Sequence, residues 1–141
     1  MIKVDSKEKM AQVNKADKLF CRFRMDGCPA CVNSQADWDQ MGAMAGSRLA
    51  PGTVIAEIEE KMAPLFRGVM GNGAAYTVHQ FPTVSIFRKG VFKGEAGNAR
   101  KKKELLKVLK NLGFMKGPGV GANPGAKRTQ RKRVARKTKR R

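Results

Sequence analysis

Short apolar runs alternate with amphipathic stretches over the first 113 residues of the chain. Short apolar runs bounded by glycine, proline or polar residues are typical of β-strands. They predict strands over residues 2–4, 19–23, 53–58 and 81–87, and a further strand over 91–93 that pairs back across the Lys89–Gly90 turn. The pattern therefore indicates a sheet of short strands.

Between these strands, apolar residues recur at the spacing of helices. In the last such stretch, Leu105, Leu109 and Leu112 share one face. Glycine, proline and small polar residues set the limits of the stretches. The predicted helices run from a cap at Asp5 or Ser6 to about Ala16, from Pro29 to Gly46, from Pro64 to about Met70, and from a cap at Asn98 to Gly113. The element order β-α-β-α-β-α-β-β-α indicates an α/β fold.

The composition is that of a folded chain. Apolar residues make up 41% of the 141 residues, which is enough to bury one hydrophobic core. The chain has no apolar run of about 18 residues that would suggest a transmembrane helix, and its N-terminal segment lacks the apolar stretch of a secretory signal. We therefore expect a protein that is not secreted and that resides in the cytoplasm, the nucleus or a virion.

Positive charge is concentrated near the C-terminal end. The formal net charge is +19, yet residues 1–98 carry 13 Lys/Arg against 10 Asp/Glu, whereas residues 99–141 carry 17 Lys/Arg and the single acid Glu104. The composition also becomes rich in glycine and proline after Met115. We therefore predict a folded domain over residues 1–115, followed by a Gly/Pro-rich linker and an extended, Lys/Arg-rich tail over residues 116–141.

The basic tail predicts an anionic partner, either nucleic acid or an acidic protein surface. Cations that neutralise phosphates release counterions, which gives binding that depends on salt but not on base sequence. The tail has neither interleaved aromatic residues for base stacking nor an apolar face for membrane insertion. A nuclear localisation signal and a merely solvated tail are the alternatives. The candidate anion-binding residues are Lys127, Arg128, Arg131, Lys132, Arg133, Arg136, Lys137, Lys139, Arg140 and Arg141.

Two cysteines, Cys28 and Cys31, stand two residues apart at the predicted start of a helix. Helix N–H groups and the positive end of the helix dipole favour a thiolate at Cys28, and Arg24 adds positive potential. Cys31 lies one turn further on and faces inward. This spacing predicts that Cys28 is the attacking thiol and Cys31 the resolving thiol of a disulfide exchange.

The same cysteines allow a second interpretation, a zinc site. Zinc takes four Cys or His ligands, and the chain offers Cys21, Cys28, Cys31 and its single histidine, His79. A second close-spaced pair of ligands is missing, which disfavours zinc. We interpret Cys21 as a small buried strand residue and expect neither a metal nor a cofactor.

Over about residues 2–113, the chain resembles the thioredoxin family. The motifs that carry the resemblance are Leu19–Phe23 followed by Cys28-x-x-Cys31, then Tyr76-x-Val78-x-x-Phe81-Pro82-Thr83, Phe87-x-x-Gly90, Gly94, and the Leu105/Leu109 helix. The resemblance implies a thioredoxin-like fold, in which helices flank a central mixed β-sheet. It also implies that Pro82 is cis beside Cys28 and that the backbone of Phe81 binds an extended substrate segment. Gly27, Pro29, Phe81 and Pro82 are the implied substrate-binding residues.

The chain departs from the family pattern at three places. Arg22 stands where the family has a buried acid that helps to move the proton of the inner thiol. An arginine there must either extend its charged end to solvent or find a partner, because an unpaired buried cation is costly. Gly27 replaces the usual tryptophan before the first cysteine. Pro29-Ala30 replaces the usual Gly-Pro between the cysteines, and there is extra chain around residues 71–75.

Two functions are consistent with these residues. Cys28, Cys31 and Pro82 favour a thiol–disulfide oxidoreductase that acts on disulfide-bearing proteins and is tethered by its tail to an anionic partner or assembly. Arg22 and Gly27 favour a non-catalytic structural component of a nucleoprotein particle, capsid or virion with a thioredoxin-like fold. We favour the first, although a fold by itself does not establish an activity.

Overall fold

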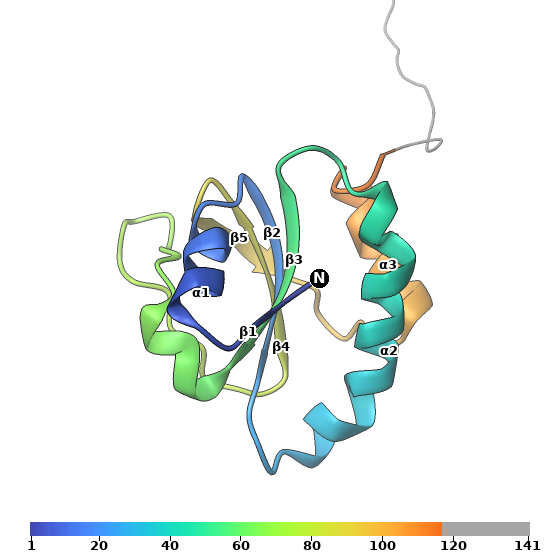
Figure 1. The fold of residues 1–141 in the computed structure, drawn as a ribbon, viewed down its shortest axis with the longest axis horizontal. Helices are drawn as coiled ribbons and strands as arrows, with labels where there is room; N and C mark the ends of the chain where they lie inside the picture. The colour runs from blue at the N-terminus through green and yellow to red at the C-terminus, as the bar shows by residue number, and fades with distance from the viewer. Residues whose placement is uncertain (117–141) are drawn as a thin grey trace, which may run out of the picture.

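A mixed five-stranded sheet forms the centre of the protein in a computed structural model, which describes residues 1–116 (Figure 1). The strands are β1 (Ile2–Val4), β2 (Lys18–Arg24), β3 (Thr53–Glu59), β4 (Thr83–Arg88) and β5 (Val91–Glu95), in the spatial order β1-β3-β2-β4-β5. β3 runs parallel to both β1 and β2, whereas β4 runs antiparallel to β2 and β5. The predicted α/β architecture with a central mixed sheet is thus confirmed.

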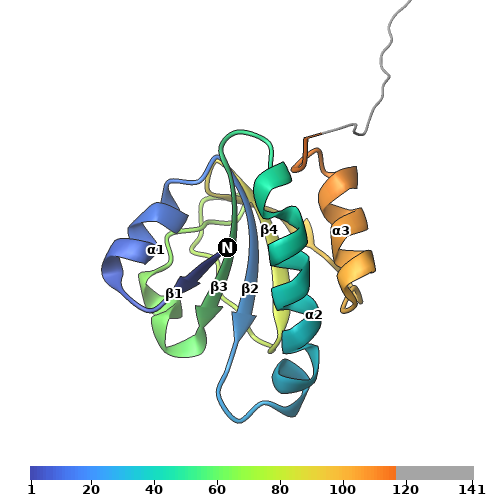
Figure 2. The same cartoon turned by 45° about the vertical axis from the view of Figure 1, so that its right-hand side comes forward.

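Helices cover both faces of this sheet. The helices α2 (Pro29–Ala45) and α3 (Lys102–Asn111) lie side by side on one face, and α1 (Lys7–Asn14) lies on the other (Figures 1 and 2). Ser6 caps α1, because its hydroxyl accepts a hydrogen bond from the backbone N–H of Lys9 at 3.2 Å. No helix within residues 1–116 is both long enough and apolar enough to cross a membrane.

Each face of the sheet carries its own hydrophobic core. Beneath α2 and α3, the rings of Phe20 and Trp38 stack with their centroids 5.8 Å apart, and Leu105 and Leu109 of α3 close the layer. Beneath α1, the core consists of Val4, Met10, Val13, Leu19, Cys21, Phe23, Ala56, Ile58 and Phe87. Side chains alternate across strand β2, so this central strand supplies both cores and is buried on both faces.

The helix predicted from Pro64 to Met70 is wrong. The chain instead forms the short 3-10 helix η2 (Glu60–Leu65) and then extends. The reason is a tertiary contact: Val69 donates its N–H to the carbonyl of Gly90 at 2.9 Å, and Phe92 donates to the carbonyl of Val69 at 2.8 Å. These bonds attach the segment to the edge of the sheet at β5, which helical geometry would prevent.

The predicted cap at Asn98 is also wrong, because α3 begins three residues later than a cap there would require. The carboxylate of Glu104 accepts hydrogen bonds from the backbone N–H groups of Arg100 and Lys101, at 3.0 and 3.2 Å. These contacts fix Lys101 as the cap residue and hold the pKa of Glu104 below its ordinary value. The predicted end at Gly113 holds, since this glycine follows the helix with a positive φ of 74°.

The ten candidate anion-binding residues of the tail, Lys127 to Arg141, lie outside the described residues. The predicted boundary between a domain over residues 1–115 and a tail over residues 116–141 therefore stays a prediction.

Candidate active site at the Cys28–Cys31 disulfide

Cys28 and Cys31 form a disulfide at the N-terminal end of α2, with their Cα atoms 5.2 Å apart. Strand β2 leads into the loop before α2, where exposed Gly27 adopts a positive φ of 75°. Cys28 is the N-cap residue, and its Sγ accepts a hydrogen bond from the N–H of Cys31 at 3.1 Å. Pro29 is the first helical residue, where its missing N–H costs no hydrogen bond.

The two sulfur-bearing residues differ in their access to solvent. Cys28 is 7% exposed and Cys31 is fully buried, and exposed Pro29 and Ala30 lie between them. This order of exposure is the one predicted for an outer and an inner thiol. The roles of attacking and resolving thiol are functional assignments and stay predictions.

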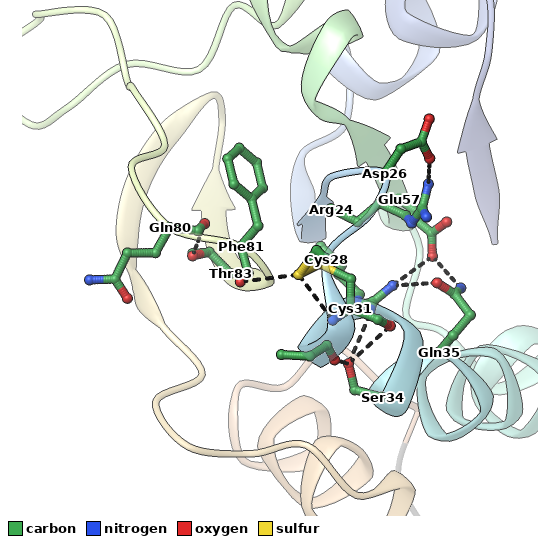
Figure 3. Close-up of a disulfide and its surroundings, with 12 residues drawn as sticks. Arg24, Asp26, Cys28, Cys31, Ser34, Gln35, Glu57, Gln80, Phe81 and Thr83 are labelled. Atoms are coloured by element: carbon green, nitrogen blue, oxygen red, sulfur yellow. Dashed lines mark hydrogen bonds and ion pairs between the residues drawn. A yellow bond between two sulfur atoms is a disulfide. The ribbon is translucent and has the colours of Figure 1, made fainter.

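The loop before β4 brings Phe81 and Pro82 to the disulfide. The Phe81–Pro82 peptide bond is cis, as the resemblance implied, and Pro82 is buried. The Sγ of Cys28 lies 3.5 Å from the carbonyl oxygen of Phe81 (Figure 3). Thr83, the first residue of β4, donates its hydroxyl hydrogen to the carbonyl of Gln80 at 2.7 Å and closes this turn. Cys28 and the predicted substrate-binding segment are therefore adjacent.

Behind the disulfide lies Arg22, of which only 1% is exposed. One terminal nitrogen of its guanidinium, Nη2, donates to the backbone carbonyl of Cys31 at 2.7 Å and to the hydroxyl of Ser34 at 2.9 Å. The other, Nη1, donates to the amide oxygen of Gln35 at 2.8 Å and to the carboxylate of Glu57 at 3.2 Å. The buried guanidinium of Arg22 is thus paired with the carboxylate of Glu57 and does not extend to solvent.

Sequence reasoning missed Glu57, which is also buried. Its signal was a single acid within the otherwise apolar run of residues 54–58. Strands β2 and β3 pair in parallel with Arg22 beside Glu57, so the two side chains share one face of the sheet. Gln35 of α2 donates to Glu57 at 2.7 Å and so joins the pair to the helix (Figure 3). Gln35 also donates to Asp39, at 3.1 Å.

Arg24, predicted to add positive potential near Cys28, is itself paired. Its guanidinium lies 2.8 Å from a carboxylate oxygen of Glu59 and 3.3 Å from one of Asp26. These acids offset its charge, and Asp26 is largely exposed to screening solvent. Arg24 therefore contributes less net potential at the disulfide than its position in the sequence suggested.

The alternative ligands for zinc are not brought together. Within residues 1–116, no group of three or more His, Cys, Asp and Glu side chains could hold a metal ion. Cys21 is fully buried in the core beneath α1, where burial and then the charge of Glu57 raise the pKa of its thiol well above the ordinary value. The interpretation of Cys21 as a buried strand residue is confirmed. His79 is exposed.

A cavity of about 440 Å³ lies next to Phe81 on the side of η2. Its wall is mainly apolar and aromatic, with Glu60 and Arg67 as its only charged residues within the described chain. The apolar lining consists of Phe23, Ala63, Pro64, Phe66, Ala75, Tyr76, Val78 and Phe81. The cavity is large enough for an apolar side chain and shares Phe81 with the disulfide site.

Solved structures with the same arrangement of elements identify the fold. Human ERp44 in its zinc-bound form superposes with a TM-score of 0.59 at 17% identity, over 79% of this chain and 31% of that one. The J-Trx1 fragment of ERdj5 superposes with a TM-score of 0.58 at 21% identity, over 79% and 50%. The chain has the thioredoxin fold. A mutant thioredoxin from Halobacterium salinarum NRC-1 matches over nearly its whole length, 90%, with a TM-score of 0.54 at 15% identity.

The chain spans about a third of the ERp44 chains and half of the ERdj5 fragment. No protein-family model and no curated protein sequence matches it. At identities of this size, structural similarity establishes a thioredoxin fold, while the chemistry has to be argued from the residues of this chain.

Proposed function

We propose that this protein is a thiol–disulfide oxidoreductase whose substrates are disulfide-bearing proteins, with Cys28 as the attacking thiol and Cys31 as the resolving thiol. The observation that supports this best is the contact between the Sγ of Cys28 and the carbonyl of Phe81, at 3.5 Å. This contact places the sulfur of Cys28, the outer cysteine of the disulfide, beside the backbone carbonyl of Phe81. An extended client segment that binds this backbone would bring its own disulfide to Cys28.

The proposed reaction is two successive thiol–disulfide exchanges. In the reducing direction, the Cys28 thiolate attacks a client disulfide, forms a mixed disulfide and releases one client thiolate. Cys31, as a thiolate, then attacks the sulfur of Cys28, forms the Cys28–Cys31 disulfide and releases the second client thiolate. Two electrons pass to the client, whose thiolates take up protons from solvent. The oxidising direction is the reverse.

The cavity beside Phe81 supports a polypeptide client over a small thiol. A client backbone at Phe81 can place a neighbouring apolar side chain in this cavity of about 440 Å³. Exposed Gly27 places no large side chain next to Cys28, and the cavity offers an apolar contact next to Phe81. A client with an aliphatic or aromatic residue near its half-cystine suits this arrangement.

A disulfide-reduction assay tests the proposal. The wild type should accelerate reduction of a disulfide-linked polypeptide by dithiothreitol, and Cys28→Ser should abolish the acceleration. Cys31→Ser should instead accumulate a mixed disulfide with the client through Cys28. The control is Cys21→Ala, which removes a buried thiol distant from the reaction and should retain the activity. If Cys28→Ser and the wild type are equally inactive, the disulfide serves the fold and the protein is a structural component.

We further propose that the basic tail tethers the enzyme to a polyanion, either nucleic acid or an acidic protein surface. The support is its sequence: the last 15 residues contain ten Lys/Arg and no acid. Such a segment binds phosphates through counterion release. A polyanion of this kind occurs in the cytoplasm, the nucleus and nucleoprotein particles, which are the proposed locations.

A further inference from the structure

The buried guanidinium of Arg22 lies directly behind the inner cysteine. Its Nη2 is 2.7 Å from the carbonyl oxygen of Cys31, the residue that carries the fully buried sulfur. Arg22 therefore contacts the backbone of the inner cysteine from strand β2, at a place where the thioredoxin resemblance implied an acid. The charge next to the inner cysteine is the reverse of the expected one.

The remaining charges of this region lie behind Arg22. Glu57 of β3 contacts the opposite nitrogen of the guanidinium, Nη1, at 3.2 Å. Asp39 of α2 binds Lys3 of β1 at 2.9 Å, and Lys3 is also 4.0 Å from Glu57. Arg24 forms ion pairs with Asp26 and Glu59. Of these groups, the guanidinium of Arg22 is the one that hydrogen-bonds to Cys31, so the charge distribution has its positive end at the inner cysteine.

The cation persists although it is buried. Burial lowers the pKa of Arg22, and the nearby carboxylate of Glu57 opposes this. An arginine starts from a pKa so high that it stays protonated in proteins. Water is largely excluded around it, so its charge acts on a nearby thiolate with little screening.

We propose that Arg22 is a positioning residue that stabilises the Cys31 thiolate and thereby lets Cys31 resolve the mixed disulfide without an adjacent carboxylate base. This proposal rests on the proposed oxidoreductase function. In the resolving step, the Cys31 thiolate attacks the Cys28 sulfur and the client thiolate leaves, so no proton has to pass from Cys31 to a neighbouring carboxylate. The proton goes to solvent when the thiolate forms.

The same charge shifts the redox equilibrium. A cation that stabilises a thiolate favours the reduced, dithiol form over the disulfide, which makes the protein a stronger oxidant. Glu57 acts in the opposite direction, because a carboxylate disfavours a nearby thiolate. Arg22 and Glu57 are hydrogen-bonded to each other, yet their charges have opposite effects on the Cys31 thiolate.

The test is the equilibrium of the Cys28–Cys31 pair with reduced and oxidised glutathione, measured in a Cys21→Ala background. Arg22→Met should shift this equilibrium toward the disulfide by about tenfold, which corresponds to about 30 mV. Glu57→Gln should shift it toward the dithiol. Arg22→Lys should remain close to the wild type, because it keeps the charge. If Arg22 and Glu57 had only a structural role, Arg22→Met and Glu57→Gln would shift the glutathione equilibrium in the same direction. That result overturns the proposal.

A second measurement separates this proposal from the proposed function. In Cys21→Ala/Cys28→Ser protein, Cys31 is the sole thiol, and its thiolate absorbance can be followed against pH without any client. Arg22→Met should move this transition to higher pH, and an unchanged transition refutes the role of Arg22. If the pair does not exchange with glutathione at all, the proposed function fails instead. Should Arg22→Met fail to fold, Arg22→Met/Glu57→Met removes both charges and should shift the transition in the same direction by less.

Discussion

The Sγ of Cys28 lies 3.5 Å from the carbonyl oxygen of Phe81, a residue 53 positions further along the chain. This contact joins the start of α2 to the loop before β4 and gives the disulfide an outer and an inner side. Cys28 stands on the outer side, next to the backbone proposed to bind a polypeptide client. Cys31 stands on the inner side, against the buried Arg22.

This arrangement predicts the order in which the thiols react. After reduction, a small alkylating reagent near neutral pH should modify Cys28 much faster than Cys31, because Cys28 lies at a helix N-terminus with 7% of its surface exposed, whereas Cys31 is fully buried. Cys21 should react only on unfolding, since burial raises its pKa and blocks access. Peptide mapping after timed alkylation measures the three rates.

The matched control for this experiment is the same reaction in denaturant, where all three cysteines should react at similar rates. Faster modification of Cys31 or Cys21 than of Cys28 in the folded protein would contradict the assignment of the attacking thiol.

The core beneath α2 predicts a large stability effect at Trp38, the single tryptophan of the chain. Trp38 is 1% exposed and stacks on Phe20, so Trp38→Ala should cost about 3–5 kcal/mol of unfolding free energy. Trp38→Phe should cost less, because it keeps an aromatic ring against Phe20. It also removes a buried indole N–H that has no hydrogen-bond partner within residues 1–116.

Urea unfolding followed by far-ultraviolet circular dichroism compares the two variants, since tryptophan fluorescence is lost in both. Equal destabilisation by Ala and Phe would show that ring packing against Phe20 is not the main contribution of Trp38.

Much of the site could be predicted because its parts are local in sequence. A strand followed by Cys28-x-x-Cys31 indicates a pair of thiols at a helix start. The position of Pro82 beside Cys28 was implied by the resemblance to the thioredoxin family, because the two residues are far apart in the sequence. The partner of Arg22 could not be assigned, because its contact with Glu57 depends on the register between β2 and β3. That register is a long-range property of the sheet.

The elements that were predicted wrongly fail for a related reason. Residues 64–70 have a helical pattern and a proline suited to a helix start, but Val69 pairs with the backbone at Gly90 and Phe92. The start of α3 depends on which backbone N–H groups the carboxylate of Glu104 reaches. In both cases hydrogen bonds formed in the folded chain outweigh the local pattern.

The single tyrosine, Tyr76, predicts a pH dependence. Burial raises its pKa above the ordinary value of 10.0, and its hydrogen bond with the hydroxyl of Ser85, at 2.7 Å, partly opposes this. A phenol whose pKa is higher in the folded than in the unfolded state binds its proton more tightly when folded. Its contribution to stability is therefore complete below about pH 10 and is lost as pH rises through the folded-state pKa.

Absorbance titration of the phenolate should accordingly give a higher midpoint in the native protein than in urea. Tyr76→Phe should cost about 1 kcal/mol at neutral pH through the lost hydrogen bond. It should also flatten the loss of stability above pH 10, relative to the wild type. A native midpoint at or below the value in urea would contradict the burial of the phenol.

The proposed tether predicts a strong dependence of polyanion binding on residues 117–141. Deleting them removes ten Lys/Arg and no acid, which lowers the formal net charge from +19 to +9. Affinity for a duplex of arbitrary sequence should fall steeply. The full chain should itself lose about three orders of magnitude in affinity between 50 and 200 mM salt if the tail neutralises about six phosphates. Fluorescence anisotropy across a salt series measures both effects.

A chain with the same tail residues in scrambled order is the matched control, and it should bind like the wild type, because counterion release depends on charge rather than on sequence. A tail with every Lys and Arg replaced by Gln should behave like the deletion. Disulfide reduction should be equal in all four proteins, since Cys28, Cys31 and Phe81 lie within residues 1–116. If the deletion leaves affinity and salt slope unchanged, the lysines around α3 bind the polyanion instead. If scrambling alone abolishes binding of the duplex, the order of the tail residues matters and counterion release does not explain the binding.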